Sequence, residues 1–174
     1  MKREKTSPSL APPLPPKRLR MKKSWREKLA DDKDLPKVVT LNATASAHWG
    51  GRTMAIPAPR EVDALMRRVQ PGRVVTINEL RAAVARQHGA AIGCPLTTGI
   101  FSWLAAHAAA EAAAAGETTI TPYWRTLKAK GELNAKYPGS IPALTARLAA
   151  EGHTVWKKGK RFFVRDYERV LAIL

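Results

Sequence analysis

Two helical segments separated by a short glycine-containing break constrain the fold of this chain most. Thr76 and Glu79 have capping-box spacing, in which the Thr hydroxyl accepts from the third helical N–H and the Glu reaches back. A helix is therefore predicted from this box to about His88. After Gly93-Cys94-Pro95 a long Ala-rich helix is predicted over about 95–115. Two helices joined by such a turn predict a helix-turn-helix, whose second helix can lie in a groove of DNA.

The flanking segments indicate a mainly α fold with small β structure. Apolar residues at a spacing of 3.6 predict a helix over 59–70, and a short β-type run is expected over 118–121. Another helix ends at Glu151-Gly152. The segment 153–164 is typical of a β-hairpin, and a last helix is expected over 167–174. The fold class predicted is a winged helix-turn-helix domain with a disordered basic N-terminal arm.

The chain divides into three parts by composition. Residues 1–23 hold five prolines between Pro8 and Pro16 and carry a net charge of +7, which predicts a disordered basic arm. Residues 24–57 are expected to form an extension that packs on the core, anchored by Trp25 and Trp49. Residues 58–174 are predicted to form the winged-helix domain, with the basic hairpin in its C-terminal part.

Charge is the strongest bulk property of the 174-residue chain. There are 30 Lys and Arg residues against 14 Asp and Glu, for a net charge of +16, which favours nucleic acid or an anionic membrane as the partner. No stretch has the roughly 18 apolar residues of a membrane span, so we expect no membrane partner. Cys94 is the single cysteine, and the four histidines lack ligand spacing, so no metal and no cofactor are expected. These features predict a cytoplasmic, nucleoid-associated protein.

Two segments are candidates for DNA contact. The long helix starts with Leu96 followed by Thr97, Thr98 and Gly99, which allow close backbone approach and hydroxyl contacts to phosphates or base edges. Alternatively, the two threonines only cap the helix. The hairpin carries a set of cations that are expected to grip phosphates: Lys157, Lys158, Lys160 and Arg161. A solvated hairpin without a partner is the alternative.

Residues from about Glu61 to Gly152 resemble the DNA-binding domain of the O6-alkylguanine-DNA alkyltransferases and alkyltransferase-like proteins. The resemblance rests on the run from Arg73 to Leu80, on Thr121-Pro122-Tyr123-Trp124-Arg125, and on the segment from Lys130 to Gly152. The second of these stands where the family has its Pro-Cys-His-Arg-Val motif. The resemblance implies the winged-helix fold, duplex DNA as the partner, repair or regulatory proteins as further partners, and a DNA contact by Arg125.

The chain departs from the family at the positions that carry its chemistry. Tyr123 stands in place of the alkyl-accepting cysteine, and Trp124 in place of the activating histidine. A phenol is a poor nucleophile at neutral pH, and an indole cannot act as a base. Glu151 matches the carboxylate that supports the family's histidine. The resemblance therefore makes Tyr123, Trp124 and Glu151 candidate lesion-pocket residues without a catalytic role.

Two further positions differ from the family's base-flipping set. The arginine that fills the space of a flipped base aligns with Gly99, and a tyrosine near the phosphate aligns with Ile77. The sequence thus predicts a non-enzymatic DNA-binding protein of alkyltransferase-like type, with recognition of alkylated DNA as a further hypothesis. The alternatives are a transcriptional or nucleoid-associated factor without lesion preference, and a divergent alkyltransferase using Cys94. RNA remains an open partner, because a basic arm and hairpin do not discriminate by themselves.

Overall fold

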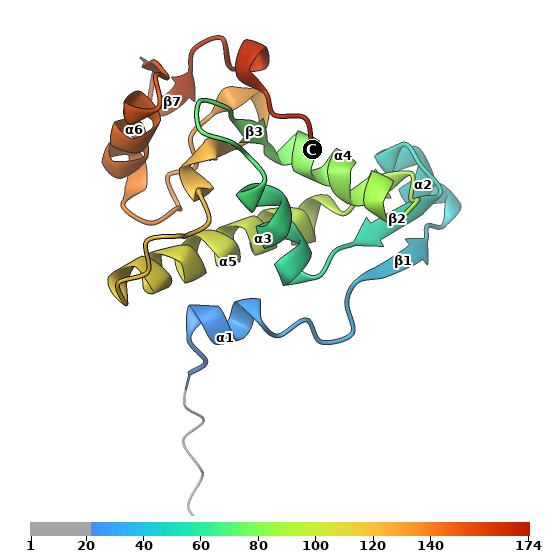
Figure 1. The fold of residues 1–174 in the computed structure, drawn as a ribbon. Coiled ribbons are helices and arrows are strands. Elements are labelled where there is room, and N and C mark those ends of the chain that lie inside the picture. Colours follow the sequence, from blue (N-terminus) through green and yellow to red (C-terminus); the bar gives the residue numbers. More distant parts are fainter. Residues whose placement is uncertain (1–21) are drawn as a thin grey trace, which may run out of the picture.

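The computed structural model describes residues 22–174, so the predicted arm lies almost entirely outside the described residues. The prediction of a mainly α fold with small β structure is confirmed (Figure 1). The α-helices are α1 (Trp25–Leu29), α2 (Ala43–Trp49), α3 (Pro59–Arg67), α4 (Ile77–Gln87), α5 (Pro95–Ala114) and α6 (Ser140–Ala150), with 3₁₀ turns η1 (Tyr123–Arg125), η2 (Ala129–Gly131) and η3 (Tyr167–Val170). The strands are β1 (Lys37–Thr40), β2 (Thr53–Ile56), β3 (Val75–Thr76), β4 (Ile92–Gly93), β5 (Thr126–Leu127), β6 (Val155–Lys158) and β7 (Arg161–Val164).

Helices α3, α4 and α5 form the centre of the core. Val62 and Met66 of α3 are fully buried, as the predicted periodicity requires. On α5 the buried positions are mostly alanines, among them Ala105 and Ala106, and small side chains let α3 lie close against this helix (Figure 1). The Ala-rich sequence of α5 therefore serves close helix packing.

The helix-turn-helix order is present, and its turn is held by a strand that sequence patterns did not indicate. The Thr76–Glu79 capping box starts α4 as predicted. In the turn that follows, β4 pairs in parallel with β2, and β2 pairs antiparallel with β1. The backbone N–H of Cys94 donates to the carbonyl of Ala55 at 2.8 Å. Residues 37–56 are thus joined directly to the turn before α5.

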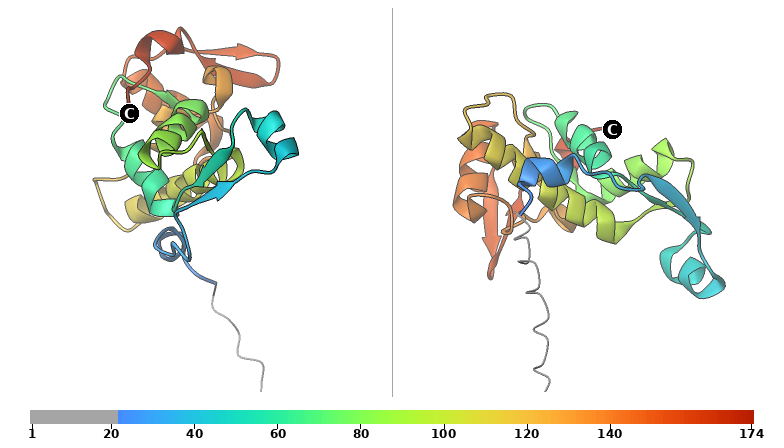
Figure 2. Two further views of the ribbon diagram at one scale, coloured as in Figure 1. Left: turned by 90° about the vertical axis from the view of Figure 1, so that its right-hand side faces the viewer. Right: turned by 90° about the horizontal axis from the view of Figure 1, so that it is seen from below.

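The two tryptophans of the extension have different roles. Trp25 lies edge-on to Trp103 of α5, with ring centroids 4.9 Å apart, and stacks on His107 at 4.7 Å. Its predicted role as an anchor is confirmed. The same prediction for Trp49 is wrong, because α2 stands at the far end of β1 and β2 and leaves this side chain 39% exposed (Figure 2).

The C-terminal part contains the predicted hairpin of β6 and β7, but two other expectations were wrong. Residues 118–121 form no strand, since the Thr121 hydroxyl turns toward α3 and donates to Asp63 at 2.5 Å. The parallel pair is made instead by β5 and β3. The last helix is a single 3₁₀ turn, because the chain then extends beside Val74, whose carbonyl accepts from Ala172 N–H at 2.8 Å.

Within residues 22–174, none of the helices combines the length and apolarity that crossing a bilayer requires.

Replacing Gly93 by alanine is expected to destabilise the fold by about 2–3 kcal/mol. A Cβ at Gly93 would overlap the backbone carbonyl of Arg81, which cannot move without disturbing α4. Gly99→Ala is the matched control, because nothing lies within 4 Å of the Cβ it would add. There, alanine is expected to be neutral or stabilising by about 0.5–1 kcal/mol. Urea unfolding of both variants checks this, and equal stability would contradict the close approach of the turn to α4.

Candidate nucleic-acid interface

The start of α5 exposes apolar side chains rather than hydroxyls. Thr98 is completely buried and its hydroxyl donates to the carbonyl of Cys94 at 2.7 Å, so the predicted DNA contact of this side chain is wrong. The capping alternative is wrong as well, because no side chain of the described residues caps the start of α5. Thr97 and Gly99 are only partly exposed. The residues most open to solvent here are Leu96, 69% exposed, and Ile100, 47% exposed.

The basic hairpin presents three lysines to solvent. Lys157, Lys158 and Lys160 are exposed, and within residues 22–174 none of them forms an ion pair with an acidic side chain. Lys157 lies 5.7 Å from the ring centre of Phe162, which holds its stem against the strand. Their charges are therefore available to an external anion.

Arg161 differs from its neighbours because it has a partner. It forms an ion pair with Glu132, which also pairs with Lys128. The Glu132 side chain is only 7% exposed, and the hydrogen bond from Arg161 is the largest cause of its lowered pKa. Arg161 thus fixes the hairpin to the segment before α6, which reduces the charge it offers to phosphate.

A groove of about 970 Å³ lies between α5 and the segment 128–136. Pro95, Leu96 and Ile100 line one side of it, and Lys128 and Glu132 the other. Glu132 also binds Arg161, so the wall of this groove opposite α5 is joined to the hairpin. Sequence reasoning missed Glu132, for which no motif exists, although a lone acidic residue among Lys128, Lys130 and Lys136 is a detectable signal.

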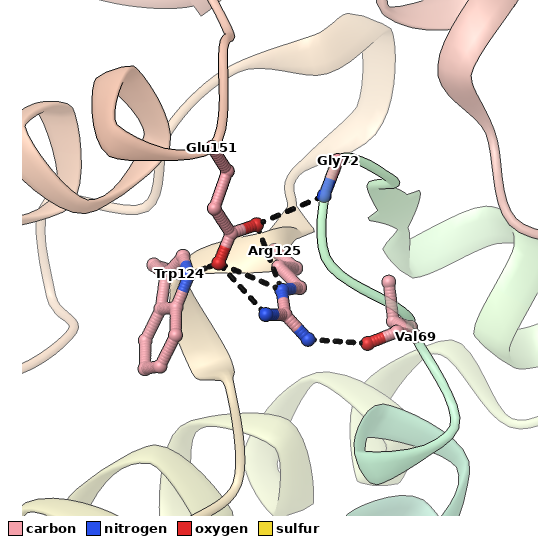
Figure 3. A network of polar contacts seen from close by, with 5 residues as sticks. All are labelled: Val69, Gly72, Trp124, Arg125 and Glu151. Atoms are coloured by element: carbon pink, nitrogen blue, oxygen red, sulfur yellow. Dashed lines mark hydrogen bonds and ion pairs between the residues drawn. The ribbon is translucent and has the colours of Figure 1, made fainter.

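Arg125 is held inside the protein and is not available to DNA in this arrangement. Its Nη2 and Nε bond the carboxylate of Glu151 at 2.7–3.0 Å, and its Nη1 donates to the carbonyl of Val69 at 2.6 Å (Figure 3). Its side chain is 11% exposed. The DNA contact expected for Arg125 is therefore corrected: the residue joins η1 to α3 and α6.

Glu151 accepts hydrogen bonds from two segments, η1 and the turn at Gly72. Besides Arg125, the indole N–H of Trp124 donates to it at 2.8 Å, and the backbone N–H of Gly72 approaches at 3.4 Å (Figure 3). Burial alone would raise the pKa of Glu151, but the hydrogen bonds from Arg125 and Trp124 outweigh it and lower the pKa. The carboxylate is thus a structural anion.

The aromatic pair of the predicted lesion pocket is packed into the protein. Tyr123 is 5% exposed and meets the rings of Trp124 and Tyr137 edge-on, at centroid distances of 5.5 and 6.0 Å. Burial raises the pKa of Tyr137 to about 12. The guanidinium of Arg147 lies 4.4 Å from the Trp124 ring centre. Tyr123 is therefore a core side chain in this structure.

Cys94 is buried at the N-cap of α5, with 9% exposure. Its backbone, rather than its sulfur, makes the contacts described above. This burial fits a small core side chain better than a nucleophile.

No model of a protein family matches the chain, and no curated protein does. Among solved structures, the chain is similar to S. pombe Atl1 in complex with damaged DNA containing O6-carboxymethylguanine, at 16% identity and a TM-score of 0.47. It is also similar to S. pombe ATL in complex with DNA, at 16% identity and a TM-score of 0.48. Each comparison covers 66% of this chain and 93% of the other.

Removing the Glu151 charge as Glu151→Gln is expected to destabilise the protein by about 3 kcal/mol at pH 7, because Arg125 would stay buried without a counter-charge. Since the folded-state pKa of Glu151 lies below its unfolded value of about 4.5, its contribution is complete above that value and is lost as pH falls through the folded pKa. The stability gap between wild type and variant should therefore narrow in acid. Urea unfolding from pH 7 to pH 3 measures it, and a constant gap would contradict a charge-based role.

Proposed function

We propose that this protein binds duplex DNA without catalysing a reaction, through the start of α5 and the basic hairpin. One observation carries the proposal: Glu132, which lines the groove beside the exposed start of α5, forms an ion pair with Arg161 of the hairpin. The same hairpin carries Lys157, Lys158 and Lys160, which form no ion pair within residues 22–174. A cationic projection beside an exposed helix of a helix-turn-helix suits a groove flanked by phosphates.

The exposed face of α5 argues for binding with little sequence discrimination. Direct readout of bases needs side chains such as Arg, Lys, Asn or Gln. From Pro95 to Trp103 the helix has none of these, and its most exposed side chains are Leu96 and Ile100. Phosphate contacts and groove shape would then supply the binding energy.

Burial of Tyr123 favours the alternative without lesion preference over recognition of alkylated DNA. An extruded base needs a pocket and an aromatic face for stacking. Tyr123 occupies the position itself, and Arg147 lies over Trp124. Cys94 is buried as well, which supports a non-enzymatic protein. If the protein binds DNA, we further propose that it is located at the nucleoid and that repair or regulatory proteins are its partners.

Neutralising the hairpin as Lys158→Gln with Lys160→Gln should weaken duplex binding and lower the slope of log affinity against log salt by about 2. The charge control is Arg60→Gln with Arg68→Gln, at the start and just past the end of α3, which removes two charges outside the hairpin and should leave the slope unchanged. Arg60 also pairs with Asp32 at 3.5 Å, so urea unfolding should accompany this variant. Fluorescence anisotropy across salt concentrations gives both slopes. Equal losses in the two variants would indicate a general charge effect and contradict a hairpin site.

Duplexes containing O6-methylguanine or guanine at one position should bind with affinities that agree within about twofold at matched salt, because Tyr123 is buried and Arg147 covers the Trp124 ring, so neither ring is free to stack on an extruded base. The same titration with an RNA duplex decides between the nucleic acids. Clearly tighter binding to the alkylated duplex would instead support lesion recognition.

A further inference from the structure

Residues 37–56, comprising β1, α2 and β2, form a second projection that we call the β1–β2 arm. Both views in Figure 2 show this arm and the basic hairpin extending from the body on the same side, with α3 on the other side of α5. The start of α5 therefore has a projection on either flank. Only the hairpin was expected from the sequence.

The arm is attached rigidly beside the start of α5. Its strand β2 pairs with β4, in the turn that leads directly into this helix. The backbone N–H of Ala91 donates to the Thr53 hydroxyl at 3.0 Å, and that of Cys94 donates to Ala55 at 2.8 Å. A partner bound at the start of α5 would therefore find the arm in a fixed position beside it.

The composition of the arm suits an anionic partner. From Lys37 to Arg60 the sequence contains no Asp or Glu. Lys37 is neutralised by Asp34 at 2.7 Å, whereas Arg52 is exposed and forms no ion pair within residues 22–174. Arg52 lies where α2 returns into β2, near the outer end of the arm.

Trp49 adds an aromatic contact at the same place. Its indole is 39% exposed and meets the His48 ring edge-on at 4.5 Å. A large indole left open to solvent contributes little to folding, while tryptophan is favoured in interfaces where one edge stays wet. An exposed cation beside an exposed aromatic ring matches the phosphates and sugars of a nucleic-acid backbone.

We propose that the β1–β2 arm is a second DNA contact, which binds the duplex backbone beyond the start of α5 on the side away from the hairpin. Arg52 pairs with a phosphate and Trp49 packs on the adjoining sugar. This inference rests on the proposed function, since it requires that α5 and the hairpin hold the duplex. It extends the proposed DNA-binding surface beyond the start of α5, and the added contacts come from the arm.

The test compares full-length wild type with Trp49→Ala and Arg52→Gln combined, on a short duplex and on one extended by about one helical turn at each end. The variant should lose about tenfold in affinity for the long duplex, lower its salt slope by about 1, and bind the short duplex as wild type does. Hydroxyl-radical footprints should shorten at one edge only. Arg68→Gln, just past the end of α3, is the charge-matched control, and the hairpin variant should weaken binding to both duplexes.

The outcomes separate the two proposals. If wild type binds no duplex, the proposed function and this inference both fail. If wild type binds and the arm variant matches it on both duplexes, the arm inference alone is overturned. A wild-type dimer that Trp49→Ala dissociates in sedimentation would assign the arm to a second copy of the chain and also overturn it. Urea unfolding should show that the variant stays folded under the binding conditions, since Trp49 lies outside the core and Arg52 is exposed.

Discussion

The bidentate pair between Arg125 and Glu151 is the constraint on which the remaining structure depends. Through it η1, the end of α3 and the end of α6 share one polar network, in which Val69 and Gly72 contribute backbone groups. A guanidinium removed from water needs acceptors for its N–H groups, which the Glu151 carboxylate and the Val69 carbonyl supply, while the Gly72 N–H donates to Glu151. The network therefore fixes the angle at which the C-terminal part, with its hairpin, meets the helical core.

Local signals predicted the fold where they agreed with tertiary packing. The Thr76 capping box and the apolar spacing in α3 gave their helices correctly, because the same contacts operate in an isolated segment and in the protein. The end of the chain was expected to be helical but extends along Val74, where a backbone partner far away in sequence outweighs helix propensity. Strands β2 and β4 were not predicted, because each depends on a pairing partner far away in the sequence. Strand β4 is also only two residues long, which is too short for a sequence pattern.

The sequence predicted which residue types occur at the candidate site. It did not predict which of their side chains are buried or ion-paired. The hairpin lysines could be identified, because unpaired surface charge follows directly from sequence. The sequence could not show which cations have acidic partners. Arg125 pairs with Glu151, 26 positions away in the chain, and Arg161 pairs with Glu132, 29 positions away. Burial of Thr98, one residue from the half-buried Thr97, depends on helix rotation, which composition does not determine.

Tyr123 and Trp124 contribute to packing and to the polar network in this protein. The Tyr123 ring is 5% exposed and meets Tyr137 edge-on at 6.0 Å, so its volume contributes to the core. Trp124 meanwhile keeps a hydrogen bond to Glu151 and leaves the Arg125 network intact. A change from Tyr123 to a smaller residue would therefore leave a cavity in the core. The exposed side chains at the start of α5, Leu96 and Ile100, can instead change without disturbing core packing.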